Sequence, residues 1–277
     1  MAFVAVPWRS SAQGSCTRHV TFKPLARADQ SQAFVERPLR QIMSLKDDLV
    51  IANRILYAQG VVDAFGHVSV RDETDPGTYW IARNMAPASV TADDLIRYDY
   101  DGAPSDGDER RPYLERYIHG SVFRARSDVG AVVHSHAQST IPFGIVPEAR
   151  LRPVWHMSSF IGGDVPIFEI RDVEGDASDL LVRSSATGDA LAHSLGQSTA
   201  VLMRGHGATV VGRNVHEAVF RAVYLALNAR VQVEASRLGA LMSLTAAEAI
   251  AATATIAGQI DRAWDLWAAE AAATSSS

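Results

Sequence analysis

The chain has 277 residues, 47% hydrophobic and 21% charged, which is the composition of an ordinary globular protein with enough apolar material for a core. Its formal net charge of -5 comes without any basic stripe, so nothing in the sequence supports nucleic-acid binding. No stretch reaches the roughly 18 uninterrupted apolar residues of a transmembrane helix, so no membrane partner is expected.

Cys16 is the only cysteine, which excludes an intrachain disulfide, a zinc site built from thiolates and an iron–sulfur cluster held by this chain alone. A metal would therefore have to rest on histidine and carboxylate side chains, which suit Zn²⁺, Mn²⁺ or Fe²⁺. This use of cysteine predicts a reducing, cytoplasmic setting.

The N-terminal segment is basic and aperiodic, with no acidic residue before Asp29. It fits either a transit-like peptide or an extension without regular structure, and it lacks the apolar core of a secretory signal. We favour the second interpretation and divide the chain into an N-terminal extension (residues 1–40), one domain (residues 41–270) and a tail (residues 271–277).

Helical spacing of apolar residues predicts a first helix over residues 44–57, with Ser44 as its N-cap and Gly60 as its stop. Two short strands follow at 66–71 and 78–83, separated by a turn-rich segment. The same criteria then predict a helical turn at 91 leading into a strand before the turn at 101–102, a helix at 111–128, a strand over 129–134, a helix starting within 136–145, a strand at 166–170, a helix at 178–195, a strand pair with a glycine turn at 199–212, and helices at 214–239 and 246–269. Helices alternating with strands, without a glycine-rich nucleotide loop, indicate a layered α/β domain.

Two histidines lie one residue apart in "VGAVVHSHAQST" (129–140), at the end of an apolar, β-branched run. On a strand, residues i and i+2 point to the same face, so His134 and His136 are expected to project together. Such a pair can hold a metal, but histidines at strand ends often only make hydrogen bonds.

Two further patterns place candidate metal-binding or acid/base residues in the same domain. His206 is flanked by two glycines, which leaves room for a close approach, although glycine-flanked polar residues are usually turns. Glu115 and His119 lie four residues apart on the helix before the paired histidines and share a face, as a solvated helical pair also would. Together the patterns favour a metal site, because three imidazoles can hold a catalytic metal with an open position, and a nearby carboxylate can complete the shell or move protons.

The order of these motifs resembles the class II aldolase/adducin family, in particular its fuculose-phosphate aldolase branch. The matching segments cover roughly residues 45–240 and are "FGHVSVR" (65–71), "RPYLERYIHG" (111–120), "AVVHSHA" (131–137) and "LMRGHGATVVG" (202–212). The resemblance implies a single three-layer α/β/α domain with a central, mostly antiparallel sheet. It also implies a homotetramer with its active site at a subunit boundary.

The resemblance assigns roles to particular residues of this chain. His134, His136 and His206 would be the ligands of a divalent metal (Zn, Mn or Fe), and Glu115 would be the acid/base that also approaches it. The catalytic tyrosine of the aldolases falls on His156, which is either a proton donor that titrates near neutrality or a structural histidine.

The departures from the family pattern bear on the substrate. The serines that hold phosphate in sugar-phosphate aldolases are replaced by Tyr113 and Leu114, the Gly-Asn turn by Gly66 and His67, and the threonine–glycine segment by "APAS" (86–89). Phosphate needs several donors converging on a dianion, so these changes count against a sugar phosphate. The combination looks most like the branch that decarboxylates hydroxylated aromatic or pyridine carboxylates.

A decarboxylase needs a donor for the substrate carboxylate and an acid for the ring carbon. Arg83 is our choice for the carboxylate, although a surface arginine at a strand end fits the sequence equally well, and His67 and Tyr113 would line the same pocket. Two alternatives remain, an aldolase for a non-phosphorylated hydroxy-acid or hydroxy-ketone and an iron-dependent oxygenase. A non-enzymatic, adducin-like binding module is disfavoured because such modules lack the metal histidines.

Overall fold

The computed structural model describes residues 44–274, with no side-chain detail for the last of them. The expected N-terminal extension (residues 1–40) and the last three residues of the expected tail lie outside this range. No helix within the described range is both long and apolar enough to cross a membrane.

The centre of the domain is a seven-stranded sheet with the strand order β3-β2-β1-β4-β7-β6-β5. Neighbouring strands pair antiparallel except β5 and β6, which pair in parallel. The strands are β1 (His67–Arg71), β2 (Thr78–Ala82), β3 (Leu95–Asp99), β4 (Ala131–Ser135), β5 (Ile167–Phe168), β6 (Ala200–Met203) and β7 (Gly207–Gly212).

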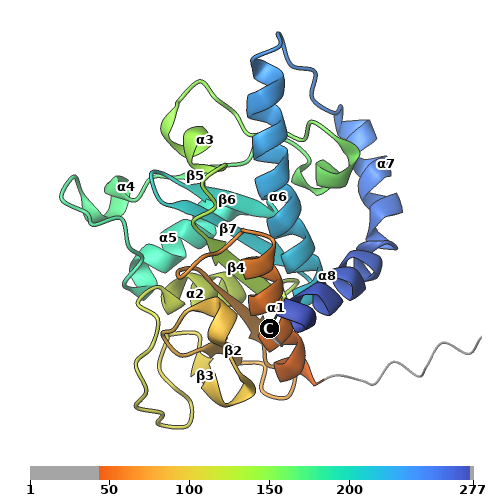
Figure 1. The fold of residues 1–277 in the computed structure, drawn as a ribbon. Helices are drawn as coiled ribbons and strands as arrows, with labels where there is room; N and C mark the ends of the chain where they lie inside the picture. Colours follow the sequence, from red (N-terminus) through yellow and green to blue (C-terminus); the bar gives the residue numbers. More distant parts are fainter. Residues whose placement is uncertain (1–43, 275–277) are drawn as a thin grey trace, which may run out of the picture. The chain divides into compact units, whose positions relative to one another are not determined.

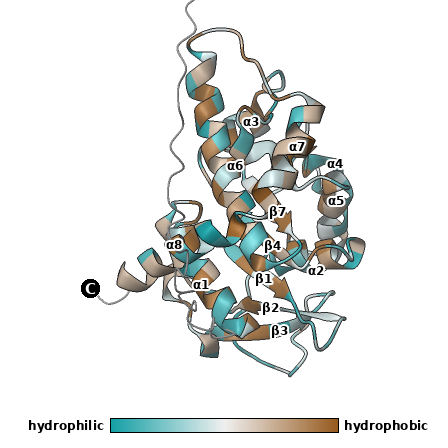
Figure 2. Ribbon diagram, turned by 90° about the vertical axis from the view of Figure 1, so that its right-hand side faces the viewer, coloured by the Kyte–Doolittle hydropathy of each residue, from teal (hydrophilic) through white to brown (hydrophobic). Residues whose placement is uncertain are grey.

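Helices cover both faces of this sheet, as Figures 1 and 2 show. Helices α1 and α6 pack against strands β1, β4 and β7, while α2 and α5 pack on each other and on the opposite face. The expected three-layer α/β/α domain with a mostly antiparallel sheet is confirmed. The helices are α1 (Leu45–Ala58), α2 (Arg116–Ala125), α3 (Ile141–Ile145), α4 (Arg171–Glu174), α5 (Ser185–Leu195), α6 (Val215–Ser236), α7 (Ala246–Ala257) and α8 (Ile260–Thr274), with 3-10 turns η1 (Pro87–Ser89), η2 (Ala92–Asp94) and η3 (His156–Ile161).

Strand β1 presents a polar face to α2. His67, Ser69 and Arg71 alternate along the strand and therefore point to the same side of the sheet. The Arg71 guanidinium donates to the carbonyl oxygens of Phe123 and Arg126 at the end of α2. This face is thus built for hydrogen bonding, and it continues toward the histidine of β4 that pairs with His67.

Several helix boundaries differ from the sequence expectation, and capping explains one of them. The helix expected at 178–195 begins only at Ser185, because the side chain of Ser184 accepts from the Thr187 N–H and caps it there. At α1 the expected cap is confirmed, since the hydroxyl of Ser44 accepts from the Asp47 N–H in a capping box.

The helix expected at 111–128 is shorter, and the last helix is divided. Helix α2 spans Arg116–Ala125 with Glu115 as its N-cap residue. Glu115 therefore lies at the N-terminus of the helix and not on one of its faces. The helix expected at 246–269 is two helices, α7 and α8, which are separated at Gly258 and Gln259. The first of these differences matters for the site, because it frees the Glu115 carboxylate to turn toward β4.

Candidate metal centre

Four side chains from distant parts of the chain converge at one end of the central strands β4 and β7 of the sheet. We call Glu115, His134, His136 and His206 the Glu/His cluster; one ligand atom from each lies within 4.8 Å of all the others. The Nε2 atom of His136 is 3.1 Å from that of His134 and 2.9 Å from that of His206. The Oε2 atom of Glu115 is 3.4 Å from Nε2 of His134 and 3.5 Å from Nε2 of His206.

The strands β4 and β7 set the positions of the three imidazoles. His134 belongs to β4 and His136 follows its end, so both project toward one side, as the sequence predicts. His206 lies in the tight turn between β6 and β7. A Cβ atom at Gly207 would meet the Ser135 carbonyl oxygen at 2.0 Å, so only glycine lets β7 come this close to β4.

Glu115 is held by a backbone group from the other side of the site. Its Oε1 atom accepts from the Val182 N–H at 3.0 Å, which leaves Oε2 directed at the imidazoles. The residue is only 6% exposed, so the orientation of the carboxylate is fixed by protein contacts instead of by water.

His206 is oriented by the same segment. Its Nδ1 atom lies 2.8 Å from the carbonyl oxygen of Leu180, and because a carbonyl only accepts, Nδ1 carries the hydrogen and Nε2 faces the cluster with its lone pair when the ring is neutral. Leu180 has a φ of 69°, the only positive φ of a non-glycine residue within 44–274. Such a conformation in a leucine is strained, and strain of this kind gathers at functional sites.

The contributions of Leu180 and Val182 cannot be predicted from the residue types, because both act through backbone atoms that any residue supplies. The helix expected over 178–195 would place these groups in intrahelical hydrogen bonds, whereas in the structure they bond to His206 and Glu115. Ser184, a typical N-cap residue, was the available signal that the helix starts later.

Burial and mutual charge set the protonation of the cluster. Burial lowers the pKa of His134, and burial together with the charges of His134 and His206 lowers the pKa of His136 to about 4. Burial opposes the charged forms of Glu115 and His206 as well, but it is outweighed at Glu115 by His134 and then His206, and at His206 by Glu115. As a result the pKa of Glu115, which also faces His134, lies well below its usual range and that of His206 is raised.

This donor set fits a divalent cation. Neutral imidazoles at His134 and His136 offer lone pairs, and the Glu115 carboxylate supplies negative charge that offsets the desolvation of an ion. Ligand atoms about 3.4 Å apart are expected around a tetrahedral ion with bonds of about 2.0–2.1 Å. Four of the separations between ligand atoms, at 2.9–3.5 Å, are of this size, and all of them lie within 4.8 Å.

A family model named "Class II Aldolase and Adducin N-terminal domain" matches residues 47–233. The chain belongs to the class II aldolase and adducin family. The match spans the sheet, the helices on both of its faces and all four members of the Glu/His cluster.

Several relatives within this class II aldolase family are decarboxylases. The chain is 38% identical over 198 residues to the decarboxylase tropJ of Talaromyces stipitatus, covering 67% of this chain and 74% of that protein. It is 29% identical over 215 residues to a 3,4-dihydroxyphthalate decarboxylase of a Terrabacter species, covering 73% and 85%. Among solved structures, the L-fuculose 1-phosphate aldolase of Glaciozyma antarctica superposes with a TM-score of 0.66 at 25% identity, covering 80% of this chain and 88% of that one.

One of the expected substrate residues, His67, lies directly beside the cluster, and a second, Tyr113, packs on it. His67 pairs with His134 across β1 and β4, and their ring centroids are 5.0 Å apart. The Tyr113 ring lies 4.6 Å from that of His67, and its hydroxyl donates to the Met85 carbonyl oxygen. Burial raises the pKa of Tyr113 to about 12, so this phenol stays protonated at neutral pH.

His119 is not the solvated partner of Glu115 that helical spacing suggests. It is fully buried, and its ring nitrogens lie 2.5 Å from Ser69 Oγ and 2.7 Å from His67 Nδ1. Burial lowers its pKa to about 3, so the ring is neutral. The cluster of this class II aldolase domain therefore continues into a buried polar network.

The structure does not bring the other two expected residues to the cluster. Arg83 is paired with Asp94, with a separation of 2.8 Å between Nε and Oδ1. His156 is exposed at the start of η3, where its ring lies 6.3 Å from that of Trp155. Neither has a hydrogen bond or an ion pair to the cluster within residues 44–274, so their roles stay predictions.

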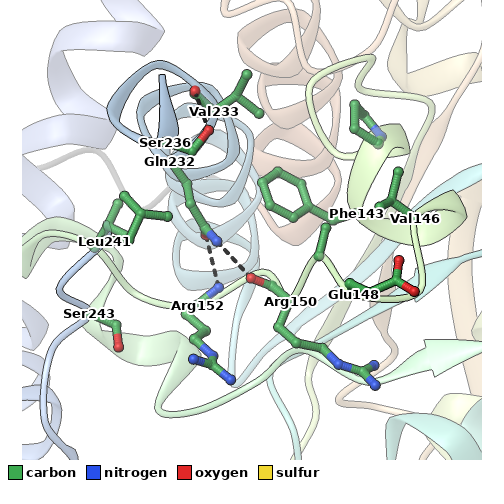
Figure 3. Close-up of a pocket in the computed structure, with 13 residues that line it drawn as sticks. Phe143, Val146, Glu148, Arg150, Arg152, Gln232, Val233, Ser236, Leu241 and Ser243 are labelled. Atoms are coloured by element: carbon green, nitrogen blue, oxygen red, sulfur yellow. Dashed lines mark hydrogen bonds between the residues drawn. The ribbon is translucent and has the colours of Figure 1, made fainter. Parts of the chain in front are cut away.

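Two cavities in the described part of the chain differ in whether a member of the cluster lines them. One, of about 310 Å³, has His136 in its wall together with Asp63 and Arg230. Another, of about 350 Å³, lies between α3, α6 and residues 241–243, where Gln232 bonds to the backbone of Arg150 and Arg152 (Figure 3). The second cavity contains no member of the cluster, so the candidate chemistry belongs near the first.

Proposed function

We propose that this protein is a metal-dependent carbon–carbon lyase that decarboxylates an ortho-hydroxy aromatic or heteroaromatic carboxylate. The observation that carries the proposal is the Glu/His cluster, with its four ligand atoms within 4.8 Å, in a chain similar to several decarboxylases. The replacement of the phosphate-binding serines by Tyr113 and Leu114 further supports a non-phosphorylated substrate.

His134, His136 and His206 would hold the divalent ion through their Nε2 atoms. When bound, that ion supplies Lewis-acid stabilisation of the negative charge that develops on the substrate as CO₂ leaves. The bond between the ring carbon and the carboxylate carbon breaks, the electron pair stays on the ring carbon, and a proton takes the place of CO₂. We propose that Glu115 passes this proton from water to the ring carbon. Its Oε2 atom faces the site, while the N–H of Val182 holds Oε1.

The remaining assignments follow from the resemblance. We propose a cytoplasmic homotetramer with the site at a subunit boundary, in which an exposed His156 on one subunit can serve the cluster of another. The residue ranges 1–40, 41–270 and 271–277 remain our proposed division of the chain.

The test combines metal analysis with a substrate panel. Purified protein is loaded separately with Zn²⁺, Mn²⁺ or Fe²⁺, and CO₂ release is measured from hydroxybenzoates, dihydroxyphthalates and hydroxypyridine carboxylates. We expect at least one metal and one acid to support CO₂ release, and His134→Ala to lose both bound metal and activity while staying folded. The exposed residue His193 on α5 supplies the control, since His193→Ala should retain both.

One relative favours a second candidate. The chain is 30% identical over 176 residues to a 4-hydroxy-3-prenylphenylpyruvate oxygenase/4-hydroxy-3-prenylbenzoate synthase of Streptomyces roseochromogenus, covering 63% of this chain and 61% of that protein. Oxygen consumption with Fe²⁺ and no CO₂ release under anaerobic conditions would replace the lyase by an oxygenase. Aldehyde formation from hydroxy-ketones, again without CO₂ release from the acids, would favour an aldolase.

A further inference from the structure

Three buried polar side chains form a hydrogen-bonded network that ends beside the Glu/His cluster. Ser69 of β1, His119 of α2 and His67 of β1 are connected through both ring nitrogens of His119, at 2.5 Å and 2.7 Å. His119 is fully buried, and its ring lies parallel to that of Tyr79 at a centroid distance of 6.2 Å. A buried imidazole with both nitrogens bonded has one fixed orientation.

The chemistry of the donors sets the direction of the hydrogen bonds. A serine hydroxyl has one hydrogen to donate, and within residues 44–274 the hydroxyl of Ser69 has no other acceptor than Nδ1 of His119. If Ser69 donates there, the neutral His119 ring carries its hydrogen on Nε2 and donates to Nδ1 of His67. The neutral His67 ring then carries its own hydrogen on Nε2.

The Nε2 atom of His67 is the last group in this series of hydrogen bonds. In imidazole the two nitrogens point in widely divergent directions, so Nε2 is directed away from His119. It has no hydrogen-bond partner within the described part of the chain, and 5% of the residue is exposed. His67 stands directly opposite His134 in the β1–β4 register, so a molecule bound at the cluster lies within reach of this group.

We propose that Ser69 and His119 are positioning residues that fix His67 as an Nε2–H donor, and that this N–H binds the carboxylate of the substrate. The second half of this inference rests on the proposed function, whereas the first half concerns the tautomer of one ring and does not. Arg83, the residue chosen from the sequence for the carboxylate, is already paired with Asp94. His67 is next to the cluster and has an unused donor.

The first experiment reads the tautomer directly. Solid-state NMR of purified, zinc-treated protein with ¹⁵N-labelled histidine distinguishes protonated from unprotonated ring nitrogens, and His67→Gln identifies the signals of His67. We expect hydrogen on Nε2 of His67 in the native protein and in Ser69→Thr, which keeps the hydroxyl, with a shift toward Nδ1 in Ser69→Ala. Hydrogen on Nδ1 of His67 in the native protein would overturn the proposal, whatever the enzyme's substrate proves to be.

The second experiment tests what the donor binds. Binding of 2-hydroxybenzoate is compared with binding of phenol, which lacks the carboxylate. In His119→Phe the affinity for 2-hydroxybenzoate should fall on the order of 10- to 100-fold, the range for losing a hydrogen bond to a charged group, with phenol unchanged. His119→Gln retains an amide donor and should restore most of this affinity.

Two results would contradict carboxylate recognition by His67. Equal losses for 2-hydroxybenzoate and phenol in His119→Phe would mean that His119 only maintains the fold. A native protein that binds phenol but not 2-hydroxybenzoate would exclude a carboxylate ligand at this position. A failed decarboxylase assay would leave the NMR result standing, so failure of the proposed function can be told apart from failure of this inference.

Discussion

Glu115 illustrates how the surroundings of a single carboxylate divide its two oxygens between tasks. Oε1 is anchored by the N–H of Val182, while Oε2 faces His134 and His206. Burial opposes ionisation, yet the neighbouring imidazoles outweigh it and hold the pKa of Glu115 well below its usual range. The carboxylate is thus an oriented anion, suited both to approach a cation and to pass a proton from water to a neighbouring carbon.

Replacing Glu115 by glutamine tests the second of these tasks. The amide keeps the size and one oxygen of the side chain but cannot carry a transferable proton, so the three imidazoles should still hold metal while turnover falls by about 10²- to 10⁴-fold. Metal content and CO₂ release are measured on the same preparations. Glu109→Gln is the matched control, because Glu109 is exposed and lies on the same segment before α2. Unchanged turnover in Glu115→Gln would remove this residue from proton transfer.

At the scale of elements, the close approach of β7 to β4 brings the turn that contains His206 next to the strand that contains His134. The register pairs His134 with Thr209 and Ser135 with Ala208, so the turn holding His206 is drawn over the end of β4. Gly207 permits this approach because the backbone of β4 fills the space where a side chain would be. Gly207 is therefore required for the packing of β7 on β4, independently of any ligand.

A methyl group at position 207 should show this dependence. Gly207→Ala places a Cβ 2.0 Å from a backbone oxygen that cannot rotate away, so β7 must move and the free energy of unfolding should fall by about 1–3 kcal/mol. Chemical denaturation measures this loss. Gly163→Ala is the control, since a Cβ there meets nothing within 4 Å. Equal stability of the two variants would show that the strands are not held as closely as described.

The sequence is most informative where a side chain itself carries the property. Alternation along β4 and the resemblance to the class II aldolases single out the residues of the Glu/His cluster, and the structure brings these residues together. Ser44 correctly predicts the start of α1, where it forms a capping box with Asp47. In these cases the side chain that makes the contact is also the one that makes the pattern.

The sequence is least informative where backbone atoms or tertiary packing decide the outcome. Leu180 and Val182 orient the cluster through a carbonyl and an N–H, which leave no mark in the residue types. His119 has the spacing of an exposed helical pair with Glu115, but Ser69 and His67 on a distant strand make it a buried network residue. Its burial depends on how α2 packs on β1, which local spacing does not encode.

At the scale of the whole described domain, one histidine connects the first helix, α1, with α6 and with the last helix, α8. His216 at the start of α6 lies 2.9 Å from Asp261 of α8 and 3.6 Å from Asp48 of α1, and its ring stacks on Trp264 at a centroid distance of 3.9 Å. Trp264 is only 4% exposed, so the last helix contributes to the core through the same contact. The attachment of α8 to α1 and α6 thus combines a stacked apolar ring with a charge that depends on pH.

The charge on His216 should make this attachment sensitive to pH. Burial opposes protonation, but the hydrogen bonds and charges of Asp48 and Asp261 outweigh it and raise the pKa of His216 above its ordinary value of about 6.5. A histidine whose pKa rises on folding adds stability that is fully present below the unfolded pKa and is lost as the pH rises through the folded pKa. His216→Phe keeps a ring on Trp264 and removes the charge.

We therefore expect urea unfolding to show a difference between native protein and His216→Phe that is largest near pH 5.5, where it should reach about 0.5–1 kcal/mol, and that shrinks toward pH 9. His193→Phe, on the exposed side of α5, corrects for the general effect of replacing a histidine. Comparison of each variant with native protein at every pH removes the titration of the Glu/His cluster, which is common to all three proteins. A difference that grows with rising pH would have the opposite sign and would mean that Asp48 and Asp261 do not hold His216 in its charged form.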